Sequence, residues 1–366
     1  ILVVGHGGTL RVLQGIFKGE ITTEQSENAG VNIFNTSPQY KRIPEVFDCW
    51  FESGSMPYAQ PHYPFENGGK VPPGFPADFI AEGMDQTRGW FYTLMILSTA
   101  LFDEPPFHNC VVNGIVLAED GKKMSKSLNN YPDPMLLTEK YGADAVRFTL
   151  MSSPAVRGED LRFSEKMVAE SMRNVLLKLW NSYSFFVTYA NAAKFDPTGT
   201  RKESKHPLDV WIKAEVQDLA NKMTEQLDKY ELSYTCSELD DTIDSLTNWY
   251  IRLSRRRFAG PGNRDCRGRQ GEDQLAALET MYEVLLTLSQ LIAPFCPYLA
   301  DAIYLNLVPE DHGSVHLTDW PNIKKLDKDE KELLERSRVM RLIVSLGHKV
   351  RSEKNIKVRQ PLHKAK

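Results

Sequence analysis

The sequence contains few cysteines and no paired cysteine motif. Its five cysteines are scattered along the chain, at Cys49, Cys110, Cys236, Cys266 and Cys296, and none of them forms a Cys-x-x-Cys pair. Disulfide frameworks and zinc ribbons both need regular, closely spaced cysteines. Cysteine usage therefore excludes a small disulfide-bonded secreted domain and fits a reducing compartment, so we expect a cytoplasmic protein without a protein-bound metal.

Long hydrophobic runs and targeting signals are also lacking. No apolar run approaches the ~20 residues that a bilayer span requires, and no charged-then-apolar leader with a cleavage site opens the chain. We therefore expect no membrane association. The chain begins with Ile1 in a strand-like run and not with Met, which indicates a piece of a longer protein. Internal repeats and low-complexity tracts are absent as well.

The remaining composition is that of an ordinary globular protein. With 366 residues, 42% hydrophobic and 25% charged, the chain can form two or three domains with ample core. A net charge of -4 argues against non-specific nucleic-acid binding by the whole surface. Between Arg336 and Lys366, however, Lys and Arg far outnumber the single acid Glu353. This basic run indicates either a polyanion footprint or a solvated helix face.

Hydrophobic periodicity divides the chain into three sections. Residues 1 to about 40 have the pattern strand, helix, strand. From about 41 to 160, short apolar runs alternate with helical patterns, as expected of an α/β sheet. The predicted strands are Phe79-Ile80 and 111–117, of which we expect the second to be buried, and the predicted helices are 88–101 and 135–141.

The section from about 165 onward is helical almost throughout. Proline and glycine punctuation spaces its helices like those of a bundle, and residues 260–273 form a polar, glycine-rich loop. The predicted helices are 165–189, 207–227, 232–258, 274–293, 296–307 and 332–350.

A cationic loop between a predicted strand and a predicted helix is the most informative segment. Gly121 lets the backbone turn, and the following run supplies two ammonium groups three residues apart together with two hydroxyls. A triphosphate entering such a loop gains several charge-assisted hydrogen bonds. Asp133 and Pro134 begin the next helix as its cap and first residue. The predicted ATP-binding residues are Lys123, Met124, Ser125, Lys126 and Ser127, with Lys123 and Lys126 catalytic. A solvated loop is the alternative.

Two further segments can form the rest of a nucleotide and amino-acid pocket. Residues 48–55 pair an aromatic wall with a glycine-serine turn, and residues 81–91 follow the Phe79-Ile80 strand and open a helix. The second segment puts carboxylate and amide groups at the carboxyl end of a strand, where open α/β sheets bind ligands. A carboxylate there can hold an ammonium group, and tryptophans can wall an apolar side chain; core packing is the alternative for both tryptophans. The residues concerned are Glu82, Gly83, Asp85, Gln86, Trp50 and Trp90.

These segments resemble the class I aminoacyl-tRNA synthetases. The Lys-Met-Ser-Lys-Ser core looks like their ATP-closing signature, and residues 42–59 and 82–91 are similar to those of the isoleucine-specific members, the isoleucyl-tRNA synthetases. The valine-specific members differ, with a Thr-Trp-Phe-Ser-Ser-Gly type of run. The resemblance spans about 41 to 366 and continues through the runs 141–148, 248–258, 293–295, 314–317 and 356–362.

The resemblance implies a fold that is α/β and then all-α. Residues 39–165 would be the C-terminal half of the Rossmann-like class I catalytic domain, and residues 166–366 a helical anticodon-binding domain. The implied activity is an isoleucine–tRNA ligase, which activates isoleucine with ATP and Mg²⁺ to the adenylate and transfers it to tRNA(Ile). Glu82 and the residues grouped with it would bind the aminoacyl adenylate, and Lys126 the ATP.

The helical half would meet the tRNA through its cations. Four arginines on one predicted helix, including Arg257, and the basic C-terminal run would face phosphates. Surface ion pairing is the alternative. The contacts that we predict are Arg252, Arg255, Arg256, Arg351, Lys357 and Arg359.

Two parts of a complete class I site are not found. None of the eight histidines forms a His-x-Gly-His motif, and a segment for hydrolysing misactivated valine is absent. We therefore expect the fragment alone to be inactive. Residues 1–38 look instead like the C-terminal end of a histidine phosphatase domain, in which His6 would bind a phosphoryl group. Besides the ligase, three alternatives stay open: an RNA-binding helical module without catalysis, a valyl-type synthetase, and a phosphohistidine hydrolase that depends on His6.

Overall fold

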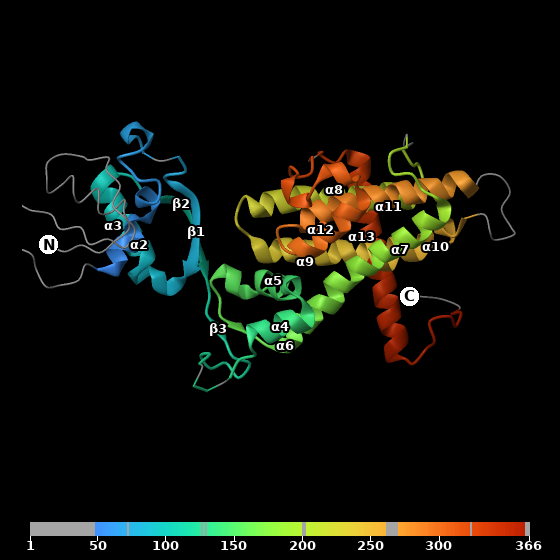
Figure 1. Ribbon diagram of the computed structural model, residues 1–366. Coiled ribbons are helices and arrows are strands. Elements are labelled where there is room, and N and C mark those ends of the chain that lie inside the picture. Colours follow the sequence, from blue (N-terminus) through green and yellow to red (C-terminus); the bar gives the residue numbers. More distant parts are fainter. Residues whose placement is uncertain are drawn as a thin grey trace, which may run out of the picture. The chain divides into compact units, whose positions relative to one another are not determined.

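The computed structural model describes residues 48–362, apart from 72, 126, 129, 200–202, 261–269 and 323. His6 with the phosphatase-like segment, and Lys126 in the cationic loop, lie outside the described residues. The chain divides into two compact units (Figure 1). The described part of the first comprises the residues up to Val116 together with Pro154–Leu161, and the second comprises Leu117–Ser153 and the residues from Arg162 onward.

The first unit is built on a parallel pair of strands. Strand β1 (Ala77–Gly83) leads through a short 3₁₀ turn into helix α3 (Trp90–Phe102), and the chain returns in strand β2 (Phe107–Asn113). The register pairs Ile80 with Cys110 and Glu82 with Val112. Ile80 packs in a small core with Phe91 and Leu94 of α3. The predicted strand at Phe79-Ile80, the predicted helix near 88–101 and the α/β class are confirmed.

The second predicted strand, 111–117, is not one strand. β2 ends at Asn113, and a separate strand β3 (Val116–Leu117) pairs with β4 (Leu161–Arg162). The break falls at Gly114, whose amide donates to the Ala155 carbonyl at 2.8 Å and where a Cβ would collide with the Glu159 carbonyl oxygen. β2 is also partly exposed and not buried as expected. A continuous apolar run therefore concealed a site of close backbone approach.

The glycine-serine turn that we predicted within residues 48–55 is helical. Helix α2 runs over Cys49–Ala59, and its N-terminus is capped by Asp48, whose Oδ1 accepts from the Trp50 amide at 2.9 Å. Gly54 lies in the middle of α2 against α3. A Cβ there would stand 2.9 Å from both Leu97 Cδ1 and Thr93 Cβ. The glycine thus allows two helices to approach closely, and this tertiary contact outweighs its poor helix propensity.

The second unit begins with a stem, which we define as residues 117–151 and 162–171. It carries the cationic loop and the helices α4 (Pro134–Tyr141), α5 (Ala143–Met151) and α6 (Glu165–Ser171). Asp133 caps α4 as predicted, its Oδ1 accepting from the Met135 amide at 2.8 Å. We did not predict α5, because it follows α4 after the single residue Gly142, whose φ is +85°. The stem shares its compact unit with the helices of the second half of the chain.

The rest of the second unit is the helical bundle that the sequence predicts (Figure 1). Its core contains the fully buried side chains of Met223, Tyr250 and Phe258. Two predicted helices, 165–189 and 232–258, are interrupted by π-helical segments at Met172–Leu176 and Ser245–Ile251. The helices are α7 (Leu177–Ala193), α8 (Pro207–Leu227), α9 (Leu232–Asp244), α10 (Arg252–Phe258), α11 (Gln270–Ile292), α12 (Pro297–Leu307) and α13 (Lys328–Glu353).

Helix α11 is the longest apolar element of the bundle in which a membrane span could be sought. Among the described residues, its Gly271–Ile292 part is the one helical stretch with the length and mean hydropathy of a membrane span. In the structure, 67% of that apolar window is buried inside the protein. The hydrophobic residues of α11 therefore form the centre of the bundle, as expected for a helix that is apolar on most of its circumference.

Candidate functional site

The cationic loop is a tight turn that returns to its own strand. The Ala118 amide donates to the Lys122 carbonyl at 2.9 Å, and the Gly121 amide donates to the Ala118 carbonyl at 2.8 Å. Lys123 then pairs with Leu117 in an antiparallel bridge. Gly121 has a φ of +80°, in the left-handed region that favours glycine. The predicted turn at Gly121 is confirmed.

Asn130 holds the two halves of the loop together. Its Oδ1 accepts from the Ser125 amide at 2.9 Å, and its Nδ2 donates to the Lys123 carbonyl at 3.2 Å. The hydroxyls of Ser125 and Ser127 lie 2.7 Å apart, so the two predicted phosphate-binding hydroxyls face each other. We did not predict the role of Asn130, because its signal is a side-chain amide that reaches back five residues.

Two neighbouring lysines of the loop have different electrostatic surroundings. Lys122 Nζ lies 3.4 Å from Asp120 Oδ2. The Lys122 amide donates to Asp120 Oδ1 at 3.0 Å; this hydrogen bond is the main cause that lowers the pKa of Asp120. The exposed Lys123 has no ion pair among the described residues. Lys123 is therefore the described loop cation that is available to an incoming anion.

The predicted adenylate-binding residues lie together on the first unit, at the end of β1 and the starts of α2 and α3. Glu82 and Asp85 are exposed. A Cβ on Gly83 would lie 2.6 Å from Asp85 Oδ1, so the glycine leaves room for this carboxylate beside the backbone. We predicted that Gly83 permits close approach to the backbone. In the structure the group that comes close is the Asp85 carboxylate.

Gln86 and Trp90 have structural partners within the same unit. Gln86 Oε1 accepts from the Trp90 amide at 2.9 Å at the start of α3. Trp90 Nε1 donates to the Ser53 carbonyl at 3.1 Å and so links α3 to α2. Trp90 is half-buried against the core of this unit, whereas Trp50 is 42% exposed. Of the two tryptophans, Trp50 is the one whose ring is open to a ligand.

The arginines of α10 do not share one role. Arg252, Arg255 and Arg256 are exposed, as the tRNA prediction requires. Arg257 is not, and the expectation that it faces phosphates is wrong. Its two Nη atoms each lie 2.7 Å from a carboxylate oxygen of Asp209. At 3.6 residues per turn, position 257 points away from the face that the other three share.

The basic C-terminal run is partly neutralised by the bundle. Arg338 pairs with Asp218 at 2.7 Å and Arg341 with Glu215 at 3.1 Å. Arg351 Nη1 donates to the carbonyls of Lys357 and Gln360, at 2.9 Å in both cases, and thereby folds the segment after α13. The candidate polyanion contacts that stay exposed are Lys357 and Arg359.

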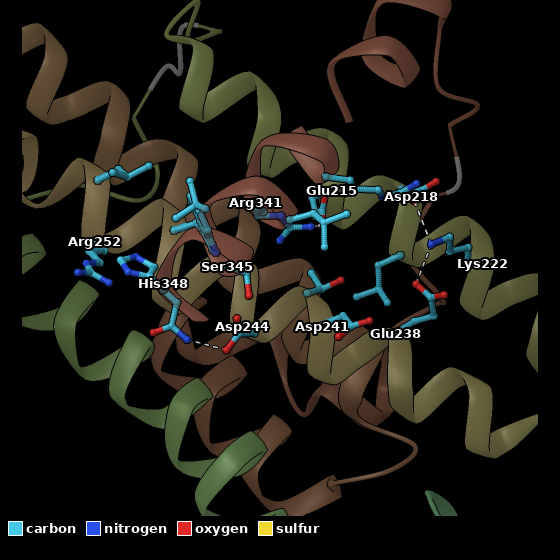
Figure 2. A pocket seen from close by; sticks show the side chains of 18 residues that line it. Glu215, Asp218, Lys222, Glu238, Asp241, Asp244, Arg252, Arg341, Ser345 and His348 are labelled. Atoms are coloured by element: carbon cyan, nitrogen blue, oxygen red, sulfur yellow. Dashed lines mark hydrogen bonds and ion pairs between the residues drawn. The ribbon is translucent and has the colours of Figure 1, made fainter. Parts of the chain in front are cut away.

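A groove of about 810 Å³ runs between α8, α9, α10 and α13. Figure 2 shows Lys222 between Asp218 and Glu238. Its Nζ lies 3.3 Å from Asp218 Oδ2 and 2.7 Å from Glu238 Oε2. The pKa of Asp241 in this groove is raised, first by burial and then by nearby carboxylates. Acids line this groove together with cations, and Glu215, Asp218 and Glu238 pair with the protein's own Arg and Lys side chains, so the groove does not form a continuous polyanion site.

Two family models match the chain. The model described as tRNA synthetases class I (I, L, M and V) matches residues 6–164. The model described as anticodon-binding domain of tRNA ligase matches residues 209–366. The first match begins at residue 6 and therefore includes most of residues 1–38. The phosphatase assignment of that segment gains no support from these matches and stays a prediction outside the described residues.

Curated relatives are named isoleucine–tRNA ligase. That of Protochlamydia amoebophila is 49% identical over 327 residues, which are 88% of this chain and 30% of the relative. That of Chlamydia trachomatis serovar A is 46% identical over 363 residues, which are 99% of this chain and 34% of the relative. That of Treponema denticola is 44% identical over an alignment of 375 residues, which covers 99% of this chain and 33% of the relative. The chain thus spans about a third of the length of these relatives.

A solved structure shares the fold. A LeuRS of Agrobacterium radiobacter K84, crystallised in a ternary complex with tRNA and LeuAMS, superposes with a TM-score of 0.59 at 18% identity. The superposition covers 80% of this chain and 34% of that one. With its parallel β1–β2 pair, its cationic loop and its helical bundle, the chain belongs to the class I tRNA synthetases and comprises part of their catalytic domain together with the anticodon-binding domain.

Proposed function

We propose that this chain is the part of an isoleucine–tRNA ligase that closes on ATP and holds the tRNA. The observation that carries the proposal is the state of the two neighbouring lysines. Asp120 pairs with Lys122, whereas the ammonium of Lys123 has no acidic partner among the described residues. Asn130 holds the backbone directly after this cation, at the Lys123 carbonyl and the Ser125 amide. The relatives named isoleucine–tRNA ligase support isoleucine as the amino acid.

In the proposed reaction the carboxylate of isoleucine attacks the α-phosphorus of ATP, which arrives as its Mg²⁺ complex. Pyrophosphate leaves, and the acyl group then passes from the adenylate to the terminal ribose of tRNA(Ile). Negative charge grows on the leaving pyrophosphate, and fixed cations lower the energy of that transition state. Lys123 supplies one such cation. The sequence motif supplies the second at Lys126.

On the other unit, the exposed carboxylates of Glu82 and Asp85 are suited to the ammonium of the amino acid. Trp50 offers an apolar wall for its side chain. Gln86 and Trp90 support this region. The Gln86 side chain accepts from the first amide of α3, and the Trp90 indole donates to a carbonyl of α2. We propose that they shape the pocket and that Glu82, Asp85 and Trp50 contact the ligand.

The tRNA would lie along the exposed cations of the bundle: Arg252, Arg255, Arg256, Lys357 and Arg359. Arg351 would contribute by folding the segment that carries the last two. We place the protein in the cytoplasm on its cysteine usage. Because the relatives are about three times as long, we propose that catalysis needs residues beyond this chain, including a His-x-Gly-His motif.

The test compares Lys123→Ala with Lys122→Ala in the full-length protein. Isoleucine-dependent exchange of pyrophosphate into ATP should fall about a hundredfold in the first variant, the loss typical of removing one transition-state donor. It should change little in the second, whose ammonium already pairs with Asp120. Affinity for tRNA(Ile) should be unaffected in both.

The outcomes separate the alternatives. Equal exchange in Lys123→Ala and the parent would exclude the assigned role of Lys123. Exchange that depends on valine and not on isoleucine would favour a valyl-type enzyme. A parent that binds tRNA(Ile) but exchanges pyrophosphate with neither amino acid would be an RNA-binding module.

A further inference from the structure

The corner between α11 and α12 depends on another element for its hydrogen bonds. Helix ends leave backbone N–H and C=O groups without partners inside the helix. Cys296, the residue before α12, has no capping side-chain hydrogen bond of its own. Without an outside partner, the first amides of α12 and the last carbonyls before it would be unsatisfied.

Helix α5 of the stem supplies these partners. Asp144 Oδ2 accepts from the Leu299 amide at 2.7 Å, and Oδ1 accepts from the Tyr298 amide at 3.4 Å. One turn along, Arg147 Nη2 donates to the Pro294 carbonyl at 3.0 Å, and Nε donates to the Phe295 carbonyl at 3.4 Å. We call Asp144 and Arg147 the stem latch. Asp144 is 6% exposed, so water cannot readily replace it.

The latched helix is joined firmly to the rest of the stem. Thr149 Oγ1 of α5 donates to Ser171 Oγ of α6 at 2.8 Å. Glu165 Oε1 of α6 accepts from Lys140 Nζ at 2.6 Å and from the Tyr141 hydroxyl at 2.8 Å, both on α4. Side-chain hydrogen bonds therefore join α6 to both α5 and α4.

The stem also carries the cationic loop at the start of α4. Asp133 caps that helix three residues after Asn130, which clamps Ser125 and Lys123. Hydrogen bonds thus connect the α11–α12 corner to α5, α5 to α6 and α6 to α4. The backbone between Asp133 and Asn130 then joins α4 to the clamp on Lys123. A displacement of α5 on the bundle would carry the loop with it.

We propose that Asp144 and Arg147 are positioning residues that set the cationic loop on the anticodon-binding bundle and so tune the ATP step that Lys123 serves. This inference rests on the proposed function. Both residues lie in the run 141–148, which belongs to the family resemblance in the sequence but was assigned no role there. Catalysis is sensitive to such placement, since a shift of ~1 Å at a reacting group costs about a hundredfold in rate.

The test uses the full-length protein and three variants. Asp144→Ala removes both acceptors of the latch. Asp144→Asn keeps a capping oxygen, and Asn caps helices about as well as Asp. Asp301→Ala is the matched control: Asp301 Oδ1 accepts from the Val315 amide at 2.9 Å, but this bond lies within the bundle and does not involve the stem.

Pyrophosphate exchange is measured per active site, with the fraction of competent enzyme counted from the burst of adenylate formation. We expect kcat to fall by about tenfold to a hundredfold in Asp144→Ala. We expect Asp144→Asn to recover most of the loss and Asp301→Ala to keep the parental kcat while lowering Tm. The Kd for tRNA(Ile) should stay unchanged in all three.

A parental kcat per active site in Asp144→Ala, with Tm lowered as in Asp301→Ala, would overturn the proposal and leave a purely structural cap. If Asp144→Ala does not fold, Arg147→Met replaces it; this variant loses the two hydrogen bonds to Pro294 and Phe295 but retains an apolar side chain. The same fall in kcat is expected, and a parental value would again overturn the proposal.

A failure of the proposed ligase function can be distinguished from a failure of the stem latch. If the parent shows no isoleucine-dependent exchange, the latch is judged by amide hydrogen exchange of residues 118–125. Faster exchange in Asp144→Ala, but not in Asp301→Ala, supports the latch. Equal rates in the parent and Asp144→Ala would overturn it.

Discussion

Arg257 and Asp209 form a bidentate ion pair inside the helical bundle. Both Nη atoms of Arg257 lie 2.7 Å from carboxylate oxygens of Asp209, and the two side chains are 9% and 0% exposed. The hydroxyls of Ser204 and Tyr250 donate to the same carboxylate at 2.6 Å and 2.8 Å. This buried charge is therefore fully hydrogen-bonded, and an arginine of the predicted tRNA-binding helix is a core residue.

We expect Arg257→Met to lower the free energy of unfolding of this chain by about 3–5 kcal/mol, because it leaves the buried carboxylate of Asp209 without its counter-charge. Urea denaturation followed by circular dichroism measures the change. Arg256→Met, one residue earlier and exposed, should stay within about 0.5 kcal/mol of the parent. Similar losses in the two variants would contradict the role of the pair.

The same pair makes stability depend on pH. Burial by itself would raise the pKa of Asp209, but the hydrogen bonds from Arg257, Ser204 and Tyr250 and the charge of Arg257 outweigh it and lower that pKa. The ionised carboxylate then stabilises the folded protein above the unfolded pKa of about 3.9. This contribution is lost as the pH falls through the lower, folded value.

Measuring the free energy of unfolding from pH 6 to pH 3 tests this sign. The parent should lose more stability on acidification than Asp209→Asn, which has no carboxyl group to protonate at this position. Parallel curves for the two proteins would show that Asp209 does not contribute to the acid sensitivity.

Two helical glycines should respond oppositely to alanine. Gly54→Ala places a Cβ 2.9 Å from Leu97 Cδ1 and Thr93 Cβ, and overpacking of this kind costs about 1–3 kcal/mol. Gly347 in α13 has no atom within 4 Å of its Cβ position, so Gly347→Ala should stabilise by about 0.4–1 kcal/mol. Thermal unfolding of the full-length variants measures both. A neutral Gly54→Ala would mean that α2 and α3 separate at little cost.

Removing Lys357 and Arg359 together should flatten the salt dependence of tRNA(Ile) binding. Each phosphate contact contributes about one unit to the slope of log Kd against log salt concentration, so the slope should fall by about two. Arg338→Ala is the control, because Arg338 already pairs with Asp218 at 2.7 Å. If the double variant keeps the parental slope, these two side chains do not contact the tRNA backbone.

Features that depend on neighbouring residues could be predicted from the sequence. The limits of α8 agree with the structure at both ends, because Pro207 suits the first turn of a helix and the apolar spacing continues to Leu227. The cap at Asp133 and the turn at Gly121 were predictable for the same reason. Each of these features involves partners within a few residues along the chain.

Features that depend on distant partners could not be predicted. The Gly54-containing segment resembled a turn until α3 was seen to pack against it. Arg257 finds its acid 48 residues away, and Arg338 finds Asp218 at a separation of 120 residues. Helical periodicity assigns a side chain to a face of its own helix, but it does not say what covers that face.

By itself, the sequence determined the order of the bundle helices, the turn of the cationic loop and the family resemblance, because short-range hydrogen bonds and residue types carry those signals. Only the tertiary structure decided which cations are free to meet a polyanion and which are bound. Arg256 and Arg257 are chemically identical neighbours along the chain. What distinguishes them is the carboxylate of Asp209, 48 residues earlier in the sequence, which the fold brings to 2.7 Å from Arg257, since the energy of a charge depends on its surroundings in space.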